Sequence, residues 1–143
     1  MRVTPEGGAA SGVAAKLFAP LERFYRKSGI ALPEIKFVDG ELVPEPAKRL
    51  LVHAGDMTSR LRKHHGAEIG LRCVSVAYDE ESMWRLVVLF RSDTGAPVEF
   101  GAIRIFLGVL DEEVRDLVVA GKEPLGGILE RCGVDYTSGP KGY

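Results

Sequence analysis

The chain has 143 residues, of which 45% are hydrophobic and 27% charged, and its formal net charge is -1. This composition is that of an ordinary globular protein, and the length suits one hydrophobic core, so we expect a single domain over residues 1–143. The lack of a basic excess argues against a nucleic-acid partner. No apolar run reaches the ~18 residues of a membrane span, so we expect no membrane partner either.

A cytoplasmic location is expected from the first residues and from the cysteines. Residues 1–11 contain no apolar run like that of a signal peptide. Cys73 and Cys132 lack the short spacing of a zinc site and the density of a disulfide framework, so both are predicted to be reduced core residues. No metal site is expected, because neighbouring histidines on a helix, such as His64 and His65, point about 100° apart.

Residues 1–11, rich in Gly and Ala, are predicted to form a mobile arm. Apolar residues then recur at helical spacing from Val13, with Ser11 as the cap and Gly29 as the stop. Residues 49–53 are predicted to form a short strand. After them, Asp56 is expected to cap a brief helix that ends at Gly66.

Three segments rich in Val, Ile, Leu and Phe follow, at residues 68–78, 83–91 and 96–107. Turn-forming clusters separate them, which predicts three sequential antiparallel strands, a β-meander. The second cluster contains Asp93-Thr94-Gly95, the same tripeptide sequence as the active-site loop of aspartic proteases. Because Arg91 and Ser92 precede it instead of apolar residues, we interpret it as a hairpin turn.

Two helices are predicted after the strands. Asp111 is expected to cap the first and Gly121 to end it, while Pro124 suits the first position of the second, which Gly133 ends. Residues 134–137 are predicted to add a final edge strand, followed by a loose tail.

Three segments in this order resemble chorismate pyruvate-lyase, a fold similar to the ligand-sensing domains of GntR-type regulators. They are residues 56–61 (DMTSRL), the strand pair around residues 84–86 (WRL) and 95–97 (GAP), and residues 121–126 (GKEPLG). The resemblance covers about residues 50–129. It implies an α+β fold with a six-stranded antiparallel sheet, helices on one side and a closed pocket. In that pocket chorismate becomes 4-hydroxybenzoate and pyruvate without a cofactor.

The ligand contacts of the family carry over to Met57, Arg85 and Leu125. A guanidinium on a buried strand can bind a carboxylate in a bidentate manner, so Arg85 is the main candidate. Its alternative is an edge-strand arginine whose stem covers apolar surface. Leu125 is alternatively a core residue, and Gly126 belongs to a helix start whose free N–H groups favour an anion.

A late Glu that family members carry in a further hairpin has no counterpart before Tyr143. Glu99 is the candidate replacement, since it lies in an otherwise apolar strand. A three-residue loop, Asp93 to Gly95, would place Arg85 opposite Ile103 and Leu89 opposite Glu99. Arg85 and Glu99 would then share a face about 13 Å apart. A loop changed by one residue would bring Arg104 to that face instead.

These residues lead to one main hypothesis and two rivals. The main one is a lyase that removes the enolpyruvyl group from chorismate or a relative, with Arg85 binding a carboxylate and Glu99 as general acid. The first rival is a non-catalytic module of the same fold that senses or carries an aromatic carboxylate. The second is a homodimer that completes its sheet or pocket through a neighbouring copy.

Overall fold

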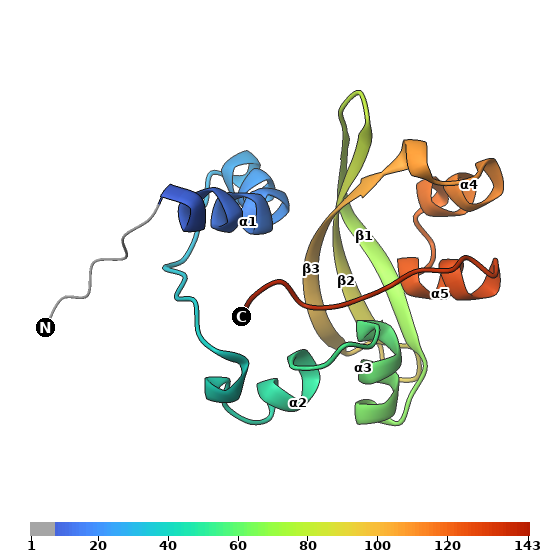
Figure 1. Ribbon diagram of the computed structural model, residues 1–143. Helices are drawn as coiled ribbons and strands as arrows, with labels where there is room; N and C mark the ends of the chain where they lie inside the picture. The colour runs from blue at the N-terminus through green and yellow to red at the C-terminus, as the bar shows by residue number, and fades with distance from the viewer. Residues whose placement is uncertain (1–7) are drawn as a thin grey trace, which may run out of the picture.

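The computed structural model describes the backbone of residues 8–143 and the side chains of residues 16–143 (Figure 1). It confirms the α+β class with a meander. The strands β1 (Ile69–Tyr78), β2 (Ser82–Arg91) and β3 (Pro97–Phe106) pair antiparallel in the order β1-β2-β3. The helices of the described residues are α1 (Gly8–Ser28), α2 (Ala47–Leu51), α3 (Met57–His65), α4 (Glu112–Ala120) and α5 (Leu125–Arg131), with short 3-10 turns η1 (Gly40–Leu42) and η2 (Leu107–Val109).

Helices cover both faces of this sheet (Figure 1). On one face Phe24 of α1 packs against Trp84 and Leu86 of β2. On the other face, Met83 and Ile105 pack against α4 and α5, and Leu89 packs with Leu61 of α3. Six strands with helices on one side, as the resemblance implies, are therefore not what the described residues form: the sheet has three strands between two helical layers.

The two helix boundaries of α3 are as predicted. The side chain of Asp56 accepts a hydrogen bond from the Ser59 amide at 2.8 Å, and Gly66 ends the helix with φ 60°. The Asp56 cap fixes the start of α3 at Met57, and Met57 packs against the cluster that includes Ile69 and Leu89 of the sheet. Gly121, with φ 66°, likewise ends α4.

Three predicted elements were wrong. Helix α1 begins at Gly8, so Ser11 is not its cap and residues 8–11 are helical; the rest of the predicted arm, residues 1–7, lies outside the described residues. Residues 47–51 form helix α2, because Pro46 sets a helix start and the Ala-Lys-Arg-Leu-Leu run consists of good helix formers. Residues 134–137 pair with no strand of the described chain.

The pairing of β2 with β3 at Arg85 and Leu89 is as predicted, although the loop between the strands is longer than the predicted three residues. Arg85 pairs with Ile103 and Leu89 with Glu99. The Arg91 amide donates to the Ala96 carbonyl at 2.9 Å, so the loop has one residue more than assumed. Phe90 pairs with Pro97 and Leu89 with Glu99, so Val98 is an extra residue in β3. This bulge offsets the longer loop, and the pairs from Leu89 to Arg85 are therefore those predicted.

Asp93-Thr94-Gly95 forms the tip of this hairpin, as predicted. The Gly95 amide donates to the Arg91 carbonyl at 2.8 Å, and Gly95 has φ 73°, a conformation that favours glycine. The Asp93 carboxylate pairs with Arg91 at 2.7 Å. In the part of the chain with described structure, no helix is both long and apolar enough to cross a membrane.

Candidate functional site

A cavity of about 590 Å³ lies between the sheet, the starts of α3 and α5, and the segment after α5. We call it the Arg85 cavity. All five site residues predicted from the sequence line it: Met57, Arg85, Glu99, Leu125 and Gly126. The cavity is open to solvent, which differs from the closed pocket that the resemblance implies.

Arg85 lies in the middle of the central strand and is 1% exposed. Its Nη2 donates a long hydrogen bond, 3.5 Å, to the Glu123 carbonyl, while Nε and Nη1 find no partner among the described residues. Burial lowers the pKa of Arg85, but the ordinary pKa of arginine lies so far above neutral pH that the side chain stays protonated in proteins. The edge-strand interpretation of Arg85 is therefore wrong: this is a buried cation without a carboxylate partner in the described chain.

An uncompensated buried charge is costly, typically by several kcal/mol. A buried charge is usually compensated by an ion-pair partner, a metal or a bound ligand of opposite charge. Arg85 lines the cavity from β2, its two unpartnered nitrogens are buried, and a guanidinium matches a carboxylate in a bidentate geometry. The chemistry of the site therefore points to an anionic group of a small molecule.

Glu99 lines the same cavity from β3 and is half-buried. Burial raises the pKa of its carboxyl group above the ordinary value of 4.5. Its carboxylate takes part in none of the ion pairs between described residues. This shift favours the protonated form of Glu99 more than in water, and in that form the group can donate a proton or a hydrogen bond.

Gly101 lies on β3 between Glu99 and Ile103, the residue opposite Arg85, and it was not predicted from the sequence as a site residue. On the cavity face of β3 the order is Ile103, Gly101 and Glu99, because alternate residues of a strand point the same way. A Cβ at Gly101 would lie 3.2 Å from Glu99 Oε1 and 3.8 Å from Val87. Gly101 thus leaves room along the floor of the cavity, and a glycine inside a strand was the available signal.

The helix starts of α3 and α5 meet at the cavity rim. A Cβ on Gly126 would lie 3.4 Å from Asp56 Oδ1, so Gly126 sits close to the cap of α3. Burial works against the ionised form of Asp56, but hydrogen bonds from Ser59 and the charge of Arg62 lower its pKa overall. Asp56 therefore adds a negative charge to the lining, a role that its identification as a cap did not anticipate.

Residues 136–139, beyond the last helix, form one wall of the cavity. Ser138 Oγ donates to the Gly55 carbonyl at 3.4 Å, and the Val38 amide donates to the Tyr143 carbonyl at 2.9 Å. The segment runs from α5 across the molecule toward the chain between α1 and α2 (Figure 1). These two contacts hold a segment without regular structure, so residues from both the predicted edge strand and the predicted tail take part in the site.

The histidines and cysteines lie outside this cavity. The rings of His64 and His65 contact each other edge-on, 4.8 Å between centroids, and His53 Nε2 lies 2.8 Å from the Leu50 carbonyl. No group of three or more metal-binding side chains occurs among the described residues. Cys73 and Cys132 are free but only half-buried, which differs from the predicted core positions.

Comparisons with protein-family models, curated proteins and solved structures found no match to this chain. The site therefore rests on its own geometry: a buried cation, one carboxyl group with a raised pKa and one with a lowered pKa around one open cavity.

Proposed function

We propose that the Arg85 cavity binds a small ring carboxylate, and that the protein is a lyase that releases the enolpyruvyl group of chorismate or a close relative. The observation that carries the proposal is the buried guanidinium of Arg85, 1% exposed and unpartnered at two nitrogens, in a cavity shared with Glu99. Met57 and Leu125 supply apolar contacts for a ring, and Gly126 leaves space beside them.

In this proposal Arg85 holds a substrate carboxylate and Glu99 is the general acid. Glu99 protonates the ether oxygen as the bond between that oxygen and the ring carbon breaks. The neighbouring ring carbon loses its proton to the Glu99 carboxylate or to water, so the ring becomes aromatic. The departing enolpyruvate tautomerises to pyruvate, which balances the reaction as chorismate to 4-hydroxybenzoate plus pyruvate.

The test is turnover by the purified chain with chorismate. We expect equal amounts of pyruvate, detected with lactate dehydrogenase, and 4-hydroxybenzoate, detected by absorbance. Glu99→Gln should lower kcat by roughly 10²–10⁴-fold while leaving 4-hydroxybenzoate binding in place. Pyruvate release no faster than without protein would refute the lyase.

One observation favours the non-catalytic alternative, a module that binds an aromatic carboxylate. Arg85 is the single cation that lines the cavity, against the two carboxyl groups of Asp56 and Glu99. This balance suits one ligand carboxylate better than the two of chorismate. Such a module would be stabilised by 4-hydroxybenzoate, by about 2.7 kcal/mol at a hundredfold excess over Kd, yet would release no pyruvate.

A further inference from the structure

Another cavity, of about 330 Å³, lies between helices α2 and α3 and is lined mainly by basic side chains. Arg49 and Leu50 line it from α2, and Arg60, Lys63 and His64 line it from α3. None of these lining residues is acidic, and none lines the Arg85 cavity. The two helices are neighbours in the fold (Figure 1). We call this space the α2–α3 cavity.

The three lining residues of α3 share one face of that helix. Arg60, Lys63 and His64 have the spacing i, i+3 and i+4, and residues with this spacing are neighbours on a helix surface. Cations in the last turn of a helix interact favourably with its dipole, which accounts for Lys63 and His64. Arg60 lies outside that turn, so the helix dipole does not explain why it joins the same cluster.

The positive charges of this lining are not neutralised by described residues. Arg60 is half-buried and Lys63 is exposed, and neither joins an ion pair with the part of the chain that the structure describes. Arg49 lies 3.7 Å from the Glu45 carboxylate, but the two side chains are 63% and 57% exposed, so this pair is weak. Like charges around one cavity repel each other, and an anion bound between them removes that repulsion.

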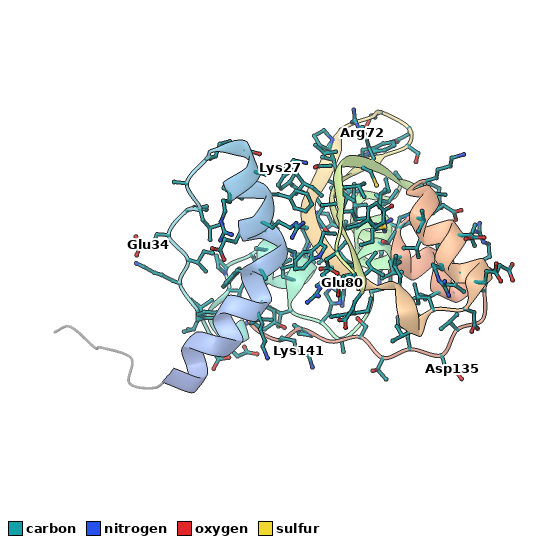
Figure 2. All side chains as sticks on the ribbon, turned by 90° about the horizontal axis from the view of Figure 1, so that it is seen from above. Lys27, Glu34, Arg72, Glu80, Asp135 and Lys141 are labelled. Atoms are coloured by element: carbon teal, nitrogen blue, oxygen red, sulfur yellow. The ribbon has the colours of Figure 1, made fainter. Side chains whose placement is uncertain are left out.

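Basic residues are concentrated in this part of the chain. Residues 47–66 contain five Lys or Arg residues and one acidic residue, Asp56, although the formal net charge of the whole chain is -1. The next cation, Arg72, does not extend the cluster. Figure 2 labels it at the margin of the sheet, and its guanidinium lies 5.7 Å from the centroid of the Phe90 ring. The excess is therefore confined to two short helices, which suits a compact anion and not a long polyanion such as nucleic acid.

The lining side chains are carried by helices that are anchored to the rest of the molecule. Leu50, the apolar residue of the lining, packs against the core cluster that contains Leu61. Lys48 of α2 donates to the Glu41 carboxylate at 2.8 Å, and the Asp56 cap fixes the start of α3. The backbone around the cavity is thus held in place before a ligand binds, which lowers the entropy cost of binding.

We propose that the α2–α3 cavity binds a phosphate group, held by Arg49, Arg60 and Lys63. Guanidinium N–H groups match phosphate oxygens in a bidentate geometry, and the Lys63 ammonium adds a further charge. His64 contributes a ring that can donate an N–H group. No Phe, Tyr or Trp lines the cavity, so it offers no stacking surface for nucleic-acid bases. The ligand class is a small compound with a phosphate or pyrophosphate group, and a phospholipid headgroup presents the same chemistry.

The test is calorimetric titration of the full chain with pyrophosphate in a phosphate-free buffer. We expect saturable binding that weakens as the salt concentration rises, because salt screens partly exposed charges. Arg60→Gln and Lys63→Gln should each raise the Kd for pyrophosphate about tenfold, since each removes a charged hydrogen bond to the phosphate oxygens. Lys63 is exposed, so its variant keeps the test valid if Arg60→Gln disturbs the packing of α3. Thermal unfolding of each variant checks that the fold is intact.

Arg62→Gln is the matched control, because it makes the same charge change on the same helix. Arg62 does not line the cavity and pairs with Glu68 at 3.2 Å, so the Kd should change by less than about twofold. Arg85→Met separates this site from the Arg85 cavity and should leave pyrophosphate binding unchanged. This site therefore stands or falls independently of the proposed lyase.

Phosphatidylcholine vesicles with and without phosphatidic acid distinguish the two sources of phosphate. Binding to the phosphatidic acid vesicles that Arg60→Gln and Lys63→Gln weaken, without binding of pyrophosphate, would support the site and assign its phosphate to a lipid headgroup. A chain that binds neither probe saturably overturns the proposal. So does binding that Arg60→Gln and Lys63→Gln weaken no more than Arg62→Gln does, or pyrophosphate binding that is lost in Arg85→Met.

Discussion

Arg85 and Glu99 reach one cavity from neighbouring strands, and the register sets them four residues apart, since Arg85 lies opposite Ile103. Burial acts on both groups in the direction of the neutral form, lowering the pKa of Arg85 and raising that of Glu99. Arg85 nevertheless keeps its charge, because the ordinary pKa of arginine lies far above neutral pH. The cavity thus combines a fixed positive charge with a carboxyl group whose pKa is raised, and each has its own measurable consequence.

Replacing the buried charge should stabilise the protein without its ligand. Arg85→Met keeps the length of the side chain and removes a charge that no described carboxylate compensates. We expect the free energy of unfolding in urea to rise by about 1–3 kcal/mol, with binding of 4-hydroxybenzoate lost. Arg91→Met, on an exposed pair with Asp93, is the control and should change stability by less than about 1 kcal/mol. An Arg85→Met protein less stable than wild type would contradict the unpaired state of this charge.

Stability should fall with rising pH on account of Glu99. Its pKa is raised in the folded state, so between the ordinary value of 4.5 and the higher folded value the native chain binds more protons than the unfolded chain. The free energy of unfolding then decreases as the pH rises through this window. Glu99→Gln removes this contribution. Urea titrations in steps of pH should therefore show the variant gaining stability relative to wild type above pH 4.5. Parallel profiles for the two proteins would argue against a raised pKa.

Alanine substitutions at two adjacent glycines of α5, Gly126 and Gly127, should have similar effects on stability but different effects on ligand binding. Gly126 lines the cavity, with its added Cβ 3.4 Å from Asp56, whereas a Cβ on Gly127 meets nothing within 4 Å. Either change to Ala should add up to about 1 kcal/mol through helix propensity. Only Gly126→Ala places a methyl group in the cavity, so only this variant should weaken 4-hydroxybenzoate binding, measured by calorimetry. Equal affinity in the two variants would place the ligand elsewhere.

The absence of a side chain at Gly40 should allow Tyr143 to pack there and so hold the C-terminal segment that follows the cavity wall. A Cβ there would lie 3.0 Å from the Tyr143 ring and 3.1 Å from Val52, so Gly40→Ala forces Tyr143 to move. We expect loss of the hydrogen bond from the Val38 amide to Tyr143 and about tenfold faster hydrogen exchange at Val38. Gly108→Ala, whose Cβ meets nothing within 4 Å, is the control. Unchanged exchange at Val38 in Gly40→Ala would show that the ring does not hold this segment.

Local chemistry was enough to predict much of the chain from its sequence. The caps Asp56 and Gly66, the turn at Gly95 and the apolar strand segments depend on neighbours a few residues away, so their positions were predicted correctly. Residues 49–53 and 134–137 were wrongly assigned to strands, because short segments have weak preferences that their surroundings override.

The tertiary structure decided what the site residues can do. That Arg85 is buried depends on α4 and α5 packing over the central strand, and a sequence pattern does not report the packing of distant segments. The register of Glu99 was predicted from a loop that is one residue too short, and it holds because the bulge at Val98 compensates. Asp56, Gly101 and the segment with Tyr136 entered the site only when the chain folded, since they are close in space and far apart in sequence.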